Sequence, residues 1–319
     1  MKIERRTFLT GACGLVATSS LPAVAECRIA EDPFPGRGIH ERLTIAYAHV
    51  EAGATKPFSV FHISDTHLTA AYPHEEIFKL GKATARGNLF GGHQEESLRD
   101  SLAWAKQNAD YVLHTGDLID WQSEANFDLV RKYCGETMFG SMGNHEFYTY
   151  LLDEKHTWQE PFKGRSWKLL KERHPFDARF SAKVVCGVNF ICMDDVFGTV
   201  QPDQVERFRA EAKKGLPMVL AMHVPILTPE LWRFTKRYWN QVNTKYVSAA
   251  LPDPSDDLKR QLEDVTTRDF FAYLKTERLL KCILAGHQHI MAEEQFSPTA
   301  RQYIVAANYL FCGREVLFT

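Results

Sequence analysis

The chain has 319 residues, of which 45% are hydrophobic, and its 38 basic and 40 acidic side chains leave a formal net charge of −2. Its 21 Phe, 11 Tyr and 6 Trp exclude a mainly disordered protein, and the near-neutral charge excludes bulk attraction to nucleic acid. No apolar run approaches the roughly 20 residues that a membrane-spanning helix needs.

Residues 1–25 have the features of an export signal. Arg5 and Arg6 precede a mildly apolar stretch from Phe8 to Val16, and Ala-Val-Ala at 23–25 forms a small-x-small cleavage site. The arginine pair resembles the bacterial twin-arginine signal, with Glu4 where Ser or Thr is usual. The resemblance implies export by the twin-arginine machinery to the periplasm or beyond, and a Sec signal is the alternative.

Strands and helices alternate along residues 26–319, which predicts one α/β domain. Apolar runs predict strands at 43–50, 58–63, 111–114, 137–142, 180–185, 188–193, 217–222, 281–285, 302–306 and 315–318. Helical spacing of apolar residues predicts helices at 95–108, 127–133, 201–214 and 268–277. We expect residues 151–175 to be less regular, and the polar, proline-interrupted residues 227–264 to form an insertion or lid.

Short polar motifs follow five of the predicted strands. They are Asp65-Thr66-His67, Gly116-Asp117, Gly143-Asn144-His145-Glu146, His223 and Gly286-His287-Gln288-His289. Because ligands collect at the carboxyl ends of strands in α/β sheets, these motifs are expected to converge despite their separation in sequence.

The residue types in these motifs are ligands for divalent metals. Asp, His and Asn supply the oxygen and nitrogen atoms that Mn, Fe, Zn and Ni accept, and the sequence does not choose among these metals. Seven such side chains are too many for one ion, whereas two ions that share a bridging carboxylate would use them all. A pair of ions about 3.5–4 Å apart is a known clamp for in-line displacement at phosphorus.

Taken in this order, the motifs resemble those of the calcineurin-like metallophosphoesterase family, from Phe58 to the end of the chain. The resemblance implies a two-sheet β-sandwich flanked by helices, with a dinuclear metal site at the strand ends. The implied ligands are Asp65, His67 and His289 for one ion, Asn144, His223 and His287 for the other, and Asp117 as the bridge. The resemblance also implies that His145 is catalytic, since it matches the histidine that contacts the phosphate or protonates the leaving oxygen.

The predicted function is hydrolysis of a small phosphorylated substrate, either a monoester or a diester. Two divalent ions lower the pKa of a bridging water toward about 7, which makes hydroxide available for attack at neutral pH. One alternative is an exported nucleotide or phospholipid phosphodiesterase. Another, from a different class, is a metal-binding scaffold without catalysis.

Two positions distinguish the chain from known subfamilies. Asp120 is followed by Trp121, so the phosphate-clamping arginine of the protein phosphatases is missing. Asp120 also stands where the purple acid phosphatases have a metal-bound tyrosine, which argues against an iron–tyrosinate centre. The role of Glu146 stays open between orienting His145 and capping a turn.

Overall fold

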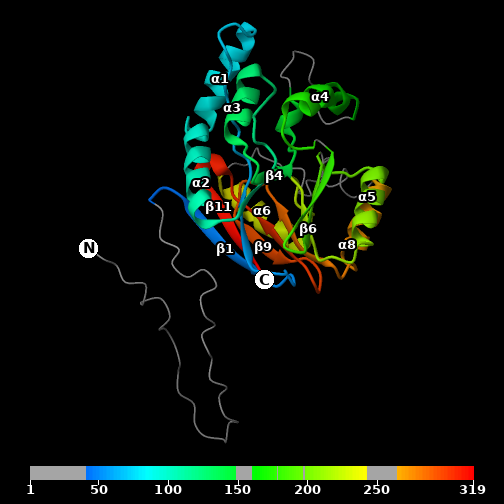
Figure 1. Cartoon of the computed structure of the whole chain (residues 1–319). Coiled ribbons are helices and arrows are strands. Elements are labelled where there is room, and N and C mark those ends of the chain that lie inside the picture. The colour runs from blue at the N-terminus through cyan, green and yellow to red at the C-terminus, as the bar shows by residue number, and fades with distance from the viewer. Residues whose placement is uncertain (1–40, 149–159, 178, 197, 243–263) are drawn as a thin grey trace, which may run out of the picture. The chain divides into compact units, whose positions relative to one another are not determined.

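The computed structural model describes residues 41–148, 160–177, 179–196, 198–242 and 264–319. The predicted export signal and residues 243–263 of the predicted lid lie outside these ranges. In the described part, two mixed β-sheets lie face to face between helices, as Figure 1 shows. This arrangement confirms the predicted α/β sandwich.

The first sheet has five strands in the order β1-β11-β2-β3-β4. Its strands are β1 (Thr44–Val50), β2 (Phe58–Ile63), β3 (Tyr111–Thr115), β4 (Met138–Ser141) and β11 (Cys312–Phe318). β2, β3 and β4 run parallel, β11 pairs antiparallel with β2, and β1 is parallel to β11 at the edge.

The second sheet has six strands in the order β5-β6-β7-β8-β10-β9. Its strands are β5 (Phe180–Val185), β6 (Val188–Met193), β7 (Met218–Ala221), β8 (Leu280–Ala285), β9 (Ala292–Gln295) and β10 (Arg301–Ile304). β6, β7, β8 and β10 run parallel, and the edge strands β5 and β9 pair antiparallel with their neighbours.

Continuous apolar runs form the central strands because both faces of each sheet are covered. Val60 of β2 packs between the two sheets, whereas its neighbour Phe61 packs against the helices outside the first sheet. In β7, Val219 likewise packs between the two sheets, and Leu220 packs against the helices outside the second sheet. Each run therefore contributes to two hydrophobic layers.

Helices cover the outer faces and connect the strands (Figure 1). They are α1 (Ile77–Leu89), α2 (Gln94–Asn108), α3 (Glu124–Tyr133), α4 (Glu160–Arg173), α5 (Pro202–Ala212), α6 (Pro229–Val242) and α8 (Val265–Leu274), with 3-10 turns η1 (His145–Phe147) and η2 (Asn308–Leu310). α2 and α3 contribute to the core outside the first sheet, and α5 and α8 to the core outside the second. No helix of the described ranges is long and apolar enough to cross a bilayer.

Three predictions differ from the structure. The irregular segment expected at 151–175 contains α4, which begins at Glu160. α1 is absent from the prediction, and none of its residues is buried. The described part of the expected lid is the helix α6, and its lid function stays a prediction.

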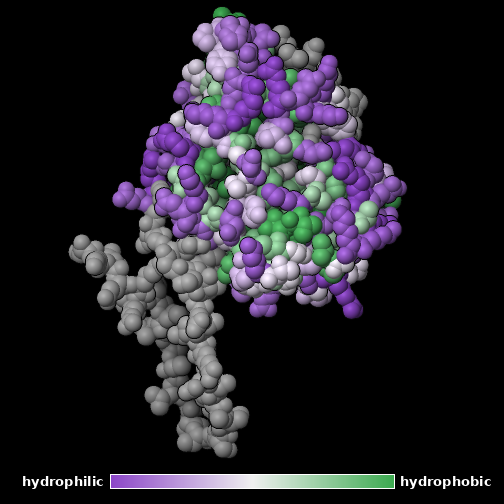
Figure 2. Space-filling view, viewed as in Figure 1, coloured by the Kyte–Doolittle hydropathy of each residue, from purple (hydrophilic) through white to green (hydrophobic). Residues whose placement is uncertain are grey.

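The face in Figure 2 is mostly hydrophilic. Apolar patches interrupt it in the central part, over the region where β9 and β11 lie in Figure 1.

Candidate metal centre

The candidate ligands lie where parallel strands of both sheets end. The register keeps the ends of neighbouring strands level, with Ile63 opposite His114 and Thr115 opposite Ser141. The loops after β2, β3 and β4 therefore begin at similar heights along the first sheet. β7 and β8 provide two further loops from the second sheet.

Hydrogen bonds to a backbone oxygen and from a backbone N–H are among the contacts that join the loops of the two sheets. The His223 Nδ1–H donates to the Thr115 carbonyl oxygen at 2.7 Å, and the His287 backbone N–H donates to Asp65 Oδ2 at 2.9 Å. The predicted convergence of the motifs is thus observed, and it occurs across the sandwich.

Asp65, His67 and His289 form the first group of ligand atoms. Nε2 of His289 lies 3.2 Å from Asp65 Oδ1 and 3.3 Å from His67 Nε2. All three side chains come from loops after β2 and β8, and Asp65 and His67 are almost fully buried. These are the three residues predicted to hold one ion.

Asp117, Asn144, His223 and His287 form the second group. Nε2 of His223 lies 3.2 Å from Asn144 Oδ1, 3.1 Å from His287 Nδ1 and 3.3 Å from Asp117 Oδ2. Asp117 Oδ2 also lies 3.7 Å from His67 Nε2 of the first group. One carboxylate oxygen therefore faces both groups, which is the arrangement expected of a bridging ligand.

The backbone at these ligands is strained. Positive φ angles between 51° and 65° occur at Asp65, His67, Asp117, His287 and His289. A side chain in this left-handed region costs of order 1–3 kcal/mol, and such residues cluster at functional sites. At Gly143 a Cβ atom would collide with the Asp117 carboxylate, so the glycine permits the close approach of the β3 and β4 loops.

The site attracts positive charge. In the metal-free chain, burial opposes protonation of His223, but the Asp117 and Asp65 carboxylates outweigh it and raise the pKa of His223 to about 10. The neighbouring histidines hold the pKa of Asp117 well below its usual value despite burial. His287 is different, because burial and the nearby His223 lower its pKa to about 3.

These residues fit two divalent ions. The buried Oδ1 of Asp65 accepts no hydrogen bond from the described residues, and the nitrogen 3.2 Å from it is Nε2 of His289, another candidate ligand. Buried polar atoms without partners are rare, and an ion is one explanation for them. Carboxylate oxygens, an amide oxygen and neutral imidazoles are suitable donors, and positive charge would replace the protons that the site attracts.

Residues 58–291 match the sequence profile of the calcineurin-like phosphoesterases. The chain belongs to the calcineurin-like phosphoesterase family. It is therefore a metal-dependent phosphoesterase, a hydrolase of phosphoric ester bonds.

The solved structures that are similar to this phosphoesterase have low sequence identity to it. A dimetal phosphatase from Danio rerio is 14% identical, with a TM-score of 0.46 over 79% of this chain and 88% of that one. The phosphopantetheinyl hydrolase from Mycobacterium tuberculosis is 14% identical, with a TM-score of 0.41 over 79% of this chain and 91% of that one. No curated protein matches the chain significantly.

Three ligand histidines of the phosphoesterase are held through their second ring nitrogen. Nδ1 of His67 lies 3.0 Å from Asp120 Oδ1, Nδ1 of His289 lies 3.2 Å from Tyr309 Oη, and Nδ1 of His223 donates to Thr115. Such outer contacts fix the orientation and tautomer of metal-binding histidines. They leave Nε2 of each ring directed at the site.

Asp120 connects the predicted catalytic histidine to this network. Nδ1 of His145 lies 2.8 Å from Asp120 Oδ1, and Arg86 of α1 donates two hydrogen bonds of 2.6 Å to the same carboxylate. Burial opposes protonation of His145, but the charges of Asp117 and Asp120 raise its pKa to about 9 in the metal-free chain. Arg86 thus pairs with the carboxylate that also contacts His145.

Glu146 orders two of the ligand loops. Its carboxylate accepts hydrogen bonds from the backbone N–H groups of Gly143 and Asp117, among others, at 2.6 and 2.8 Å. Its side chain is fully buried and does not contact the His145 ring in any recorded hydrogen bond of the described residues. Of the two roles left open for Glu146, these contacts fit the cap of a turn, since the Gly143 N–H lies three residues before it, and they extend to the loop of Asp117.

Several residues of the site were missed in the sequence. Asp195 accepts the backbone N–H of His223 at 2.9 Å, and Tyr148 accepts a hydrogen bond from Asn144 Nδ2 at 3.1 Å. Asp195 directly follows a predicted strand, which is the signal that could have identified it. Arg86 and Tyr309 lie on elements without any motif, so no local pattern marks them.

Proposed function

We propose that the chain hydrolyses phosphate monoesters or diesters at a two-metal centre, with His145 as the general acid. The observation that supports this most is the shared position of Asp117 Oδ2, within 3.7 Å of His67 Nε2 and 3.3 Å of His223 Nε2. Two bound divalent ions would neutralise phosphoryl oxygens and supply a water-derived nucleophile at neutral pH.

The protein residues would hold and orient the reacting groups. The first group, Asp65, His67 and His289, would bind one ion, and Asn144, His223 and His287 would bind the second, with Asp117 between them. Mn, Fe, Zn and Ni are all compatible with these donors.

His145 would protonate the oxygen that leaves phosphorus. Asp120 engages Nδ1 of its ring, so Nε2 is the nitrogen available to a substrate. In the metal-free chain, the charges of Asp117 and Asp120 raise the pKa of His145 and favour the protonated form that a general acid requires. Its ring lies edge-on to His67, with 4.6 Å between the ring centroids, so the acid is next to the first ligand group.

Hydrolysis of p-nitrophenyl phosphate and of its bis-ester, with added Mn²⁺, tests the proposal. We expect turnover that a chelator abolishes, and close to two ions per chain by elemental analysis. Asp117→Asn should lose both the turnover and the bound ions. Asp203→Asn is the matched control, because this exposed aspartate of α5 pairs with Arg179 away from the ligands. The ratio of the two rates distinguishes a monoesterase from a diesterase.

The His145→Ala variant tests the proposed acid. We expect kcat to fall roughly 10²–10⁴-fold while two ions stay bound, because general acid catalysis contributes that much. His93→Ala, an exposed histidine, is the control. Metal binding without hydrolysis in the wild-type chain would instead support the scaffold alternative.

We propose, in addition, that the chain is exported through the twin-arginine route to the periplasm or beyond. The support is Arg5-Arg6 ahead of a weakly apolar stretch and the Ala-Val-Ala site at 23–25. Replacing both arginines with lysine should retain the full-length protein in the cytoplasm of a bacterial host. Continued export of that variant would indicate the Sec route.

A further inference from the structure

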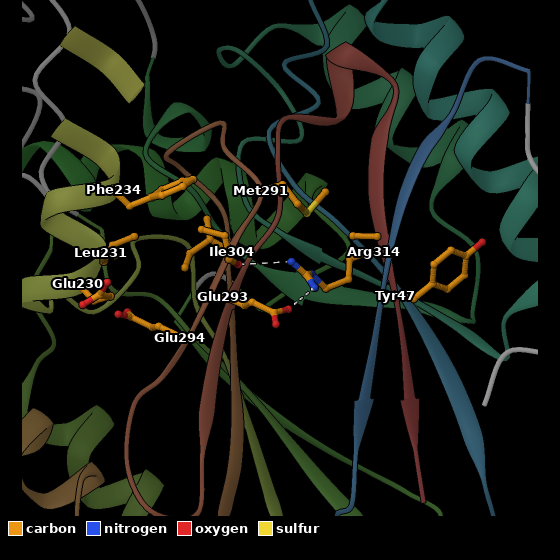
Figure 3. Close-up of a pocket in the computed structure, with 11 residues that line it drawn as sticks. Tyr47, Glu230, Leu231, Phe234, Met291, Glu293, Glu294, Ile304 and Arg314 are labelled. Carbon is orange, nitrogen blue, oxygen red and sulfur yellow. Dashed lines mark hydrogen bonds and ion pairs between the residues drawn. The ribbon is translucent and has the colours of Figure 1, made fainter. Parts of the chain in front are cut away.

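A cavity of about 450 Å³ lies between α6 and the strands β1, β9, β10 and β11. Figure 3 shows Leu231 and Phe234 of α6 directed toward Ile304 and Met291. Leu231 and Ile304 are buried, and Phe234 is 46% exposed. A pocket of this size with mostly apolar walls has the character of a small-molecule site.

Several pocket residues lie close in sequence to the candidate metal ligands. Met291 is two residues after His289, and Ile290, between them, packs with Leu231 and Ile304 in one buried cluster. α6 belongs to the connection that leaves the sheet at His223 and returns before His287. Pocket walls and candidate ligands therefore come from the same two connections, those that follow β7 and β8.

The charged groups of the pocket disfavour an anion. Arg314 is the one cation among the described lining residues, and it is already paired with Glu293 at 3.0 Å, as the dashed lines in Figure 3 show. Glu230 and Glu294 also line the pocket, and Glu294 accepts hydrogen bonds from Thr228 and Gln302. Glu230 pairs with Arg233, and Glu293 pairs with Arg301 as well as Arg314, so the lining residues in the described part of the chain offer no unpaired cation to a second phosphate.

We propose that this pocket holds an apolar, uncharged organic group of the phosphoester substrate, so that the enzyme selects lipid-like esters over nucleotides. The inference rests on the proposed function, since the phosphoryl group would occupy the two-metal centre. Burial of the organic group against Leu231, Phe234 and Met291 would supply the selectivity.

A series of n-alkylphosphonates from methyl to octyl tests the inference by competition with p-nitrophenyl phosphate. The phosphonate head is constant, so the inhibition constants report the alkyl chain alone. We expect about three- to fourfold tighter inhibition for each methylene added, until the pocket is filled. Adenosine 5′-monophosphate should inhibit more weakly than octylphosphonate.

The double variant Phe234→Ser/Met291→Ala should flatten the dependence on chain length. Val265→Ser is the matched control, because Val265 is 63% exposed on α8, does not line the pocket, and should leave the dependence intact.

Two results would overturn the inference. One is a flat series in the wild-type chain, and the other is an unchanged slope in the double variant, which would put the alkyl chain elsewhere. If the metal-loaded protein hydrolyses no phosphoester, the proposed function fails separately, and calorimetric titration with the same phosphonates still measures the chain-length dependence.

Discussion

The Asp120 carboxylate joins a predicted metal ligand, the predicted acid and an arginine of α1. In the Asp120→Asn variant, the pKa of His145 loses one of the charges that raise it, so the protonated form should disappear at a lower pH. We expect the alkaline limb of the kcat–pH profile to move toward neutrality. Asp128→Asn on the surface of α3 should leave the profile unchanged.

Tyr148 holds the side-chain amide of Asn144. Its hydroxyl accepts from Asn144 Nδ2, which directs Oδ1 toward His223. Tyr148→Phe should weaken binding of the second ion by roughly tenfold, as loss of an outer contact commonly does, measured by competition with a fluorescent chelator. Tyr72→Phe, which alters a hydroxyl bonded to Asp128, is the control.

A double-mutant cycle separates orientation of the amide from a general structural effect of Tyr148. Asn144→Asp supplies two equivalent oxygens, which need no hydrogen bond to select between them. In that background, Tyr148→Phe should have little further effect on metal affinity. An equal loss in both backgrounds would contradict the orienting role.

The sequence predicted the residues that meet at the site but not the residues that hold them. Asp65 and His289 were detectable because each belongs to a dense polar motif after an apolar strand. Tyr309 and Arg86 reach the site from η2 and α1, so their roles depend on tertiary packing that no local pattern encodes. The roles of the ligands and of His145 stay predictions.

α4 depends on a buried ion pair. Lys163 Nζ donates to Asp194 Oδ2 at 2.6 Å and to the Val196 carbonyl oxygen at 2.7 Å, and both charged side chains are almost fully buried. Lys163→Met would leave Asp194 without its cation, so we expect the free energy of unfolding in urea to fall by roughly 3–5 kcal/mol. Lys168→Met, exposed on the same helix, should change it by less than about 0.5 kcal/mol.

Elements with a clear apolar pattern were predictable, and those fixed by polar contacts were not. The hairpin of β5 and β6 was predicted with its observed bounds, because both strands alternate or run apolar around Gly187. β9 reads Ala-Glu-Glu-Gln and shows no such pattern, since it is an edge strand paired on one side. α4 escaped prediction because charged residues interrupt its apolar spacing, although Leu170 is buried in the core beside the ion pair of Lys163.

The pH dependence of stability should differ between the metal-free and metal-loaded molecule. In the metal-free chain, the pKa of His223 is raised from 6.5 to about 10 and that of His145 to about 9. A raised pKa stabilises the folded state fully below the unfolded value and loses that contribution as pH rises through the folded value. The Tm of the chelated protein should therefore fall between about pH 6.5 and 10.

Bound ions should reduce this fall, because they replace the protons at the same ligands. Calorimetric scans with and without chelator measure the difference. His223→Gln should weaken the pH dependence of the chelated protein. An equal slope in chelated wild type and variant would exclude His223 as its source.

Five candidate ligands have a left-handed backbone, which lowers the free energy of unfolding: Asp65, His67, Asp117, His287 and His289. Glycine adopts this conformation without the roughly 1–2 kcal/mol that a side chain adds. Replacement of one of these ligands by glycine would abolish catalysis. It would also remove the backbone strain at that position, so the inactive variant is expected to have a higher Tm than the active enzyme.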